Sequence, residues 1–203
     1  MKKIILLCMG IAAVADGSVK VVRTVAAEEN RSIDISVIEK MLNAISTLTT
    51  NFVQIDKMDN RSEGRSFLDR KRRLMKMDYT VPNDHVIVIK GDRVIHYDRD
   101  LKEKTESSYY SSPLSFLMDR KIDLKKNVKI MSDTQDENVR RVKITKNIDD
   151  DVGAIELMLS VKKPIRLVGW VVYDKKNDLY GTEVYLKNTE YGKSIDVEEF
   201  DKI

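Results

Sequence analysis

The stretch at residues 67–98 constrains the fold of this chain more than any other part of the sequence. Its apolar and β-branched runs are separated by a basic turn, a proline-bearing loop and a Gly-Asp turn, which is typical of four consecutive antiparallel strands. The last two runs, at residues 85–90 and 93–98, flank Gly91 and Asp92, the spacing of a two-residue β-hairpin. We therefore expect this stretch to form part of one antiparallel sheet.

The strand predicted at residues 75–79 has two different faces. Side chains alternate between the faces of a strand, so Met75, Met77 and Tyr79 share one face and Lys76 and Asp78 share the other. Methionine is flexible and polarizable, and it suits a surface that must fit an irregular apolar partner. An ordinary core in which methionine fills gaps explains the same pattern. Both interpretations remain open at this point.

The first 15 residues have the pattern of a bacterial export signal. Two lysines precede an apolar run at residues 4–14 that ends in an Ala-Val-Ala cleavage site, and the run is too short to span a bilayer. We expect residues 1–15 to be removed and the mature protein to be soluble in the periplasm. The only cysteine, Cys8, lies inside this signal. A mature chain without cysteine has no disulfide, thiol catalyst or cysteine-bound metal.

Charge and length favour one domain without affinity for nucleic acid. The chain has 203 residues with 36 basic and 33 acidic side chains; without the two lysines of the signal the balance is 34 against 33, or +1. The basic cluster at residues 70–73 contains no aromatic residue that could stack on bases. We expect residues 16–31 to be a flexible mature N-terminus and residues 32–203 to fold as one monomeric domain.

Two helices are predicted among the strands. The first, at residues 36–46, begins with a capping box formed by Ser36 and Glu39. The second, at about residues 113–120, begins at a Ser-Pro pair, a frequent N-cap and first helical position. Each helix has an apolar stripe that we expect to lie on the sheet. The stripe residues are Ile38, Met41, Leu42 and Ile45 in the first helix, with Leu48 continuing the spacing just beyond it, and Leu114, Leu117 and Met118 in the second.

Runs of β-branched and aromatic residues predict further strands along the chain. With the stretch at residues 67–98 they make a mainly β domain of about 10–11 antiparallel strands. The first of these strands places Phe52 and Gln54 on one face. The predicted ranges are residues 49–56, 102–109, 128–131, 139–145, 155–161, 165–173 and 181–187, with a short final strand near Phe200.

No constellation of residues indicates catalysis, a bound metal or a cofactor. The two histidines, His85 and His96, have no acid or nucleophile at a catalytic or metal-binding spacing. Asn147, Asp149 and Asp151 resemble the start of a calcium loop, but valine and methionine stand where glycine and the last acid are required. Phosphate-binding and dinucleotide-binding glycine motifs are absent. We therefore expect a protein that binds an apolar ligand and is not an enzyme.

Five short motifs follow one another in the order and spacing of a known family. They are the Phe-x-Gln of NFVQ, the strand leading to Tyr-x-x-Pro in MKMDYTVP, the Gly-Asp hairpin IKGDRV, the Ser-Pro before the short apolar helix in SSPLSFLMD, and the late tryptophan strand LVGWVVY. Together, from about Met41 to Phe200, they make the chain similar to the LolA family of periplasmic outer-membrane lipoprotein carriers.

The resemblance implies an unclosed antiparallel half-barrel whose concave apolar face is covered by a helical lid. Lipoprotein acyl chains would lie between barrel and lid. The implied partners are acylated lipoproteins, an inner-membrane ABC transporter that loads the carrier and an outer-membrane receptor that unloads it. A lipid-sensing regulatory module of the same fold is the alternative. The implied lipid-binding residues are Ile38, Leu42, Ile45, Phe52, Met75, Met77, Tyr79, Leu114, Leu117 and Trp170.

The resemblance also implies a basic latch on the lid. The family carries an Arg-Pro pair in the turn before the central strand, and its arginine bonds to the lid. Here the turn reads Arg-Lys-Arg-Arg without proline, which leaves Arg70 or Lys71 as the latch. A guanidinium can donate to several carbonyls at a helix end, which favours Arg70, whereas a solvated turn without this role is the alternative. The chain ends soon after Phe200, without the C-terminal extension of some members.

Overall fold

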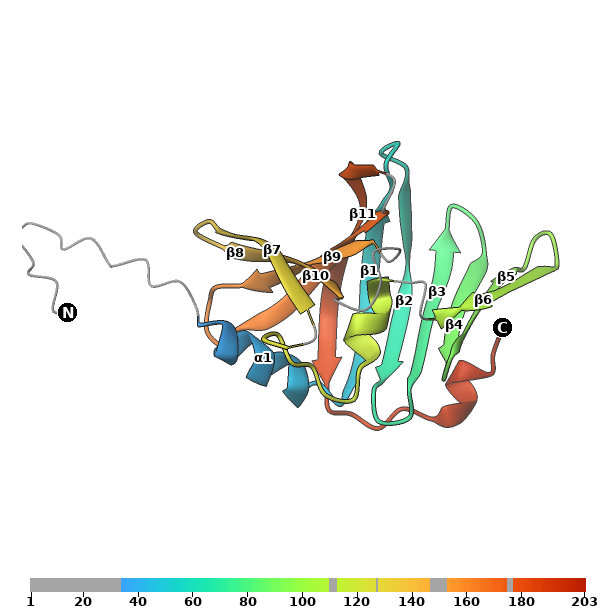
Figure 1. Ribbon diagram of the computed structural model, residues 1–203. Coiled ribbons are helices and arrows are strands. Elements are labelled where there is room, and N and C mark those ends of the chain that lie inside the picture. Colours follow the sequence, from blue (N-terminus) through green and yellow to red (C-terminus); the bar gives the residue numbers. More distant parts are fainter. Residues whose placement is uncertain (1–33, 110–112, 127, 147–152, 175–176) are drawn as a thin grey trace, which may run out of the picture. The chain divides into compact units, whose positions relative to one another are not determined.

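The described residues of the computed structural model form one antiparallel β-sheet (Figure 1). These residues are 34–109, 113–126, 128–146, 153–174 and 177–203, and all of them lie in one compact unit, Ser32–Ile203. Three predicted segments lie outside the described residues. They are the export signal at residues 1–15, the N-terminus at residues 16–31 and the calcium-like turn at residues 147–151.

Within the described residues the sheet has 11 strands in the order β6-β5-β4-β3-β2-β1-β11-β10-β9-β8-β7. Because β6 and β7 form its two edges, the sheet is not closed. The prediction of a mainly β, unclosed antiparallel half-barrel is therefore confirmed. The strands are β1 (Thr47–Ile55), β2 (Arg61–Asp69), β3 (Leu74–Val81), β4 (His85–Lys90), β5 (Arg93–Asp98), β6 (Glu103–Ser108), β7 (Val128–Gln135), β8 (Val139–Lys146), β9 (Ala154–Ser160), β10 (Arg166–Asp174) and β11 (Asn177–Tyr191).

The first predicted helix is present as α1 (Ile35–Ala44), but its predicted capping box is wrong. Asp34 is the N-cap, and its carboxylate accepts a hydrogen bond from the backbone N–H of Ser36 at 2.8 Å. Glu39 accepts instead from the backbone N–H of Leu124 at 2.9 Å. Aspartate caps a helix as well as serine does, so the earlier acid takes the position and the helix begins one residue sooner.

α1 packs against one face of the sheet, which we call the inner face (Figure 1). Its side chains Ile38 and Leu42 are fully buried there, in the same core cluster as Met75 and Met77 of β3. We call the opposite side the outer face, and β3 places Lys76 on it. The predicted alternation along β3 therefore separates an apolar inner face from a polar outer face.

The inserted segment differs in kind from the prediction. It is a 3-10 helix, η2 (Pro113–Met118), where an α-helix reaching residue 120 was expected. Short 3-10 pieces serve as connectors, and residues three apart lie above one another in them. Leu114 and Leu117 therefore still share a face, and both pack into the main core cluster.

The final strand predicted near Phe200 is also wrong. The segment is a 3-10 helix, η3 (Val197–Phe200), capped by the Asp196 carboxylate, which accepts from the backbone N–H of Glu198 at 3.1 Å. Phe200 is fully buried in a small second cluster with Phe67 of β2. This aromatic contact fixes the C-terminal segment to the outer face.

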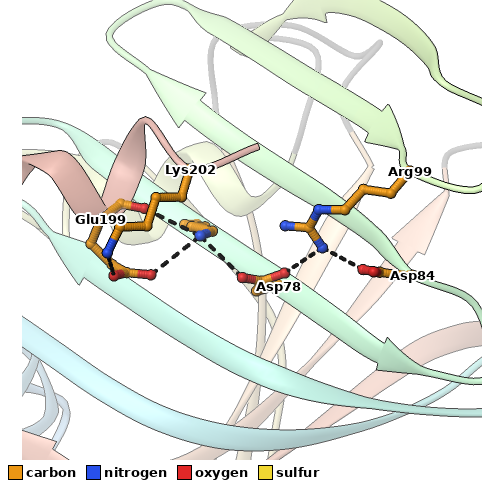
Figure 2. A network of polar contacts seen from close by, with 6 residues as sticks. Asp78, Asp84, Arg99, Glu199 and Lys202 are labelled. Atoms are coloured by element: carbon orange, nitrogen blue, oxygen red, sulfur yellow. Dashed lines mark hydrogen bonds and ion pairs between the residues drawn. The ribbon is translucent and has the colours of Figure 1, made fainter.

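Ion pairs join the same C-terminal segment to β3. The Lys76 side chain is only 1% exposed, and its Nζ lies 3.0 Å from Asp78 Oδ2 and 3.2 Å from Glu199 Oε1. Figure 2 shows how the network continues on both sides, through Asp78 to Arg99 and Asp84 and through Glu199 to Lys202. A buried lysine is tolerated here because two carboxylates face it.

Candidate functional site

An apolar cavity of about 200 Å³ lies on the inner face. Its wall is made by side chains from both halves of the sheet and from η2, so the cavity depends on the whole fold and not on one element. Polar groups are few among the lining residues. The lining residues are Gln54, Met75, Met77, Tyr79, Ile87, Ile89, Leu114, Trp170, Val172, Thr182 and Val184.

Both interpretations of the strand at residues 75–79, a packed core and a surface for an apolar partner, apply to the β3 side of the cavity. Met75, Met77 and Tyr79 are each no more than 3% exposed and belong to the main core cluster. The same three side chains line the cavity. They are thus core residues that border empty space, and the flexibility of methionine allows such a wall to change shape.

One end of the cavity is built around the Tyr79 ring. The Tyr79 hydroxyl donates to Gln54 Oε1 at 2.8 Å. The ring packs edge to face against Phe52 at 4.9 Å between centroids and stacks on His85 at 4.1 Å. Burial raises the pKa of Tyr79 and is the main cause that lowers the pKa of His85, with His96 adding to the second effect. Both shifts favour the uncharged forms, which keeps this end suited to an apolar ligand.

The predicted lid residues lie in three different places. Leu114 lines the apolar cavity. Ile38, Leu42 and Leu117 are the buried side chains of the lid elements themselves; they belong to the core cluster and are not in the cavity wall. Ile45, just after α1, lines a second cavity.

The structure brings Arg70, and not Lys71, to the end of the lid helix. Arg70 is 5% exposed, and its Nη1 donates to the carbonyl oxygens of Leu42 at 2.5 Å and Ile45 at 3.2 Å. Its Nη2 donates to the carbonyl oxygen of Asp119, beyond η2. Burial lowers the pKa of Arg70 below its usual range, and the Asp119 carboxylate opposes that change. Lys71 is exposed. The alternative of a solvated turn without a latch role therefore fits Lys71 but not Arg70.

Sequence reasoning missed six residues of the cavity wall. Two of them, Ile87 and Ile89 of β4, face Met77 and Met75 across the β3–β4 pair, and alternation through the predicted strands could have found them. Val184 of β11 faces Trp170, but that pairing depends on the order of the whole sheet. The remaining three are Gln54, Val172 and Thr182.

Among the described residues no group of three or more His, Cys, Asp or Glu side chains could hold a metal ion. In the same part of the chain no helix is long and apolar enough to cross a membrane. The lining residues of the described site are mostly apolar, which makes it an apolar container beside a helical cover.

Comparison with known families agrees with this container. Residues 43–202, most of the chain, match the family described as outer membrane lipoprotein carrier protein LolA. The chain belongs to the LolA family. LolA proteins are carriers without enzymatic activity, and membership of the LolA family implies binding of lipoproteins.

Three solved structures are similar to the chain at low sequence identity. An uncharacterized conserved protein of Thermus thermophilus is 12% identical, with a TM-score of 0.50 over 83% of this chain and 91% of that chain. A LolA superfamily protein of Nitrosomonas europaea is 10% identical, with a TM-score of 0.43 over 82% and 96%. The lipoprotein LppX of Mycobacterium tuberculosis is 10% identical, with a TM-score of 0.37 over 80% and 97%. No curated protein sequence matches the chain. The likeness to the Thermus protein concerns the fold alone.

Proposed function

We propose that this LolA-family protein is a periplasmic carrier of lipoproteins. It takes acylated lipoproteins from an inner-membrane ABC transporter, holds their acyl chains between the sheet and the lid, and delivers them to an outer-membrane receptor. The observation that carries the proposal is the apolar cavity on the inner face, walled by Met75, Met77 and Trp170 beside a lid residue, Leu114.

The size of the cavity indicates that the lid must move during loading. A lipoprotein presents about three acyl chains, and exposing each buried methylene to water costs roughly 0.8 kcal/mol. A carrier in an aqueous compartment must therefore cover the chains. The cavity of about 200 Å³ is smaller than the roughly 300–1,000 Å³ of common ligand pockets. Loading thus requires α1 and η2 to separate from the inner face.

Arg70 is the residue best placed to hold the lid in the closed state. It donates to backbone carbonyls at the ends of both lid elements. These are the carbonyls of Leu42 and Ile45 at the end of α1 and of Asp119 just after η2. Charge-assisted hydrogen bonds of this kind contribute about 1.5–3 kcal/mol each. A latch of this strength can close an empty cavity and still yield to bound acyl chains.

The latch proposal is tested by Arg70→Leu with Lys71→Leu as its matched control from the same turn. Arg70→Leu should leave loading intact and impair hand-off to the receptor. Without the latch the closed, empty state is less stable, so it no longer favours release of the acyl chains from the open, loaded state. Lys71→Leu should behave as the unmodified protein. Hand-off at the unmodified rate by a folded Arg70→Leu protein would contradict the latch.

The carrier proposal itself is tested in cells depleted of the protein. Lipoproteins destined for the outer membrane should then accumulate at the inner membrane. Normal lipoprotein sorting with an altered envelope stress response would contradict the carrier and favour a lipid-sensing module.

A further inference from the structure

A second cavity, of about 420 Å³, lies beside the end of α1 and shares no lining residue with the apolar cavity. Its walls come from three separate parts of the chain. These are the end of α1 with the residues that follow it, the turn between β2 and β3, and the segment after η2. The lining residues are Asn43, Ile45, Ser46, Arg70, Lys71 and Arg120.

The described residues that line this second cavity are cationic or uncharged, and none of them is an acid. Arg70, Lys71 and Arg120 supply three positive charges. Lys71 and Arg120 are exposed and have no hydrogen bond or ion pair with any described residue. Long cationic side chains that converge without a counterion create a positive potential, which attracts anions.

Two acids of the neighbouring segments, Asp119 and Asp69, are each paired with a cation outside the cavity wall. The Asp119 carboxylate is paired with Lys146, at 3.0 Å between Oδ2 and Nζ. The Asp69 carboxylate accepts from the backbone N–H of Arg72 at 3.0 Å and lies 3.5 Å from the Arg72 guanidinium. Each acid therefore already has another cation as its partner, and Lys71 and Arg120 are left without one among the described residues.

Arg70 adds an observation that is independent of the charges on the wall. Its Nη atoms bond to backbone carbonyls, but its Nε–H is buried and has no hydrogen-bond partner in the described part of the chain. A buried donor without a partner is unfavourable. Because this donor is buried, an acceptor in the cavity would reach it only after a shift of the Arg70 side chain.

We propose that this cavity binds an oxyanion of the phosphate class. Arginine recognises phosphate oxygens with two parallel N–H donors, and lysine adds a mobile positive charge. Arg120 and Lys71 would hold the anion from two different segments of the wall, the Ser46 hydroxyl would supply a further donor, and Arg70 lies within the same wall. The same chemistry is offered by free phosphate and by the headgroup of an anionic phospholipid.

Binding at this site would act on the lid through Arg70, a consequence that rests on the proposed carrier function. The guanidinium that faces the anion also donates to the carbonyls of Leu42 and Ile45. An anion that draws the guanidinium toward itself weakens its hold on α1. Coupling between two sites is reciprocal, so an acyl ligand that displaces α1 should in turn tighten anion binding.

The test is titration of the full mature chain with inorganic phosphate at low ionic strength and without lipid, followed by calorimetry. The double variant Lys71→Gln with Arg120→Gln should weaken binding at least about tenfold, the loss expected when two charge-assisted contacts are removed. The control is Lys162→Gln with Arg166→Gln, which removes the same charge from exposed positions elsewhere and should leave binding unchanged. No phosphate binding, or equal weakening in both double variants, would overturn the proposal.

The source of the anion is separated by a second arm with phosphatidylglycerol vesicles and neutral phosphatidylcholine vesicles. Selective binding to the anionic vesicles that is lost in the Lys71 and Arg120 double variant assigns a lipid headgroup. Phosphate binding without such vesicle binding assigns the free anion. Because the phosphate arm contains no acyl chain, its failure leaves the carrier proposal standing, and failure of acyl binding leaves the anion site standing.

Discussion

The two faces of β3 hold opposite kinds of structure. On the inner face Met75 and Met77 border an apolar cavity of about 200 Å³, whereas on the outer face Lys76 is only 1% exposed and lies between two carboxylates. Apolar contacts have no fixed direction, so an acyl chain can replace one apolar neighbour by another. Ion pairs with hydrogen bonds require fixed positions. One strand can therefore keep its place through the outer face while its inner face exchanges partners.

The C-terminal segment strengthens this difference. In this segment Phe200 packs against Phe67 of β2, and Glu199 forms an ion pair with Lys76 of β3. On the inner face α1 is held by its buried side chains, by hydrogen bonds from Arg70, and by those of Glu39 and Asn43 with residues 122–124. The bonds of Glu39 and Asn43 join α1 to the segment after η2, whereas the bonds from Arg70 join it to the turn between β2 and β3. We therefore expect the molecule to open at the inner face and to remain closed at the outer face.

The largest effect is expected from a charge on the inner face. Met77→Asp places a carboxylate without a partner where the side chain is 3% exposed, and it should lower the free energy of unfolding by roughly 3 kcal/mol or more. Binding of acyl chains should be abolished, as measured by co-purification of a lipoprotein. Met58→Asp, at a position 78% exposed, should preserve both properties. A folded Met77→Asp protein that still binds lipoprotein would show that the inner face is not the binding surface.

A smaller and separate effect is expected on the outer face. Lys76→Met keeps the length of the side chain and removes the charge between Asp78 and Glu199, which retain Arg99 and Lys202 as partners. The free energy of unfolding, measured with urea, should fall by about 1–3 kcal/mol. Lipoprotein binding by the folded variant should be unchanged, because the side chain lies on the other face. Loss of lipoprotein binding without loss of stability would contradict the proposal that the inner face binds the ligand and the outer face only stabilises the protein.

The smallest effect concerns the pH dependence of the outer face. Burial alone would raise the pKa of Glu199, but hydrogen bonds from Lys202 and Lys76 outweigh it, and the net pKa lies below the ordinary value of 4.5. Because the folded pKa is lower than the unfolded one, the ion pairs stabilise the protein above that value, and the contribution is lost as the pH falls through the folded pKa. The group is partly exposed, so we expect under about 1 kcal/mol.

The Glu199 prediction is checked by urea unfolding of the unmodified protein and of Glu199→Gln. The difference in stability between the two proteins should be present at neutral pH and vanish in acid. A difference that stays constant across the titration would show that the Glu199 charge does not hold the C-terminal segment.

Patterns within short stretches of sequence predicted most of the strands and the first helix. Contacts between distant stretches could not be predicted from such patterns. The hairpin across Gly91 and Asp92 was predicted correctly because its turn signal and both strands are adjacent in sequence, and Gly91 has a φ of 59°, a conformation that glycine adopts readily. The capping box failed because Asp34 and Ser36 compete for one position and local rules accept either.

The candidate site divides in the same way. The inward direction of Met75, Met77 and Tyr79 follows from the period of a strand. By contrast, the pairing of Lys76 with Glu199 joins residues 123 positions apart, and nothing near either residue indicates the other. The 3-10 helix near Phe200 begins at a local signal, the cap by Asp196, which the strand prediction did not use.

The central claim is that acyl chains enter the inner-face cavity, and Trp170 offers the most direct measurement of it. Trp170 is the only tryptophan of the chain, is 2% exposed and lines the cavity. Titration with a triacylated lipopeptide should change its fluorescence saturably, and the change should be absent in Met77→Asp and present in Met58→Asp. A lipopeptide that binds by co-purification while Trp170 fluorescence stays constant would contradict the account, as would a lipopeptide that does not bind.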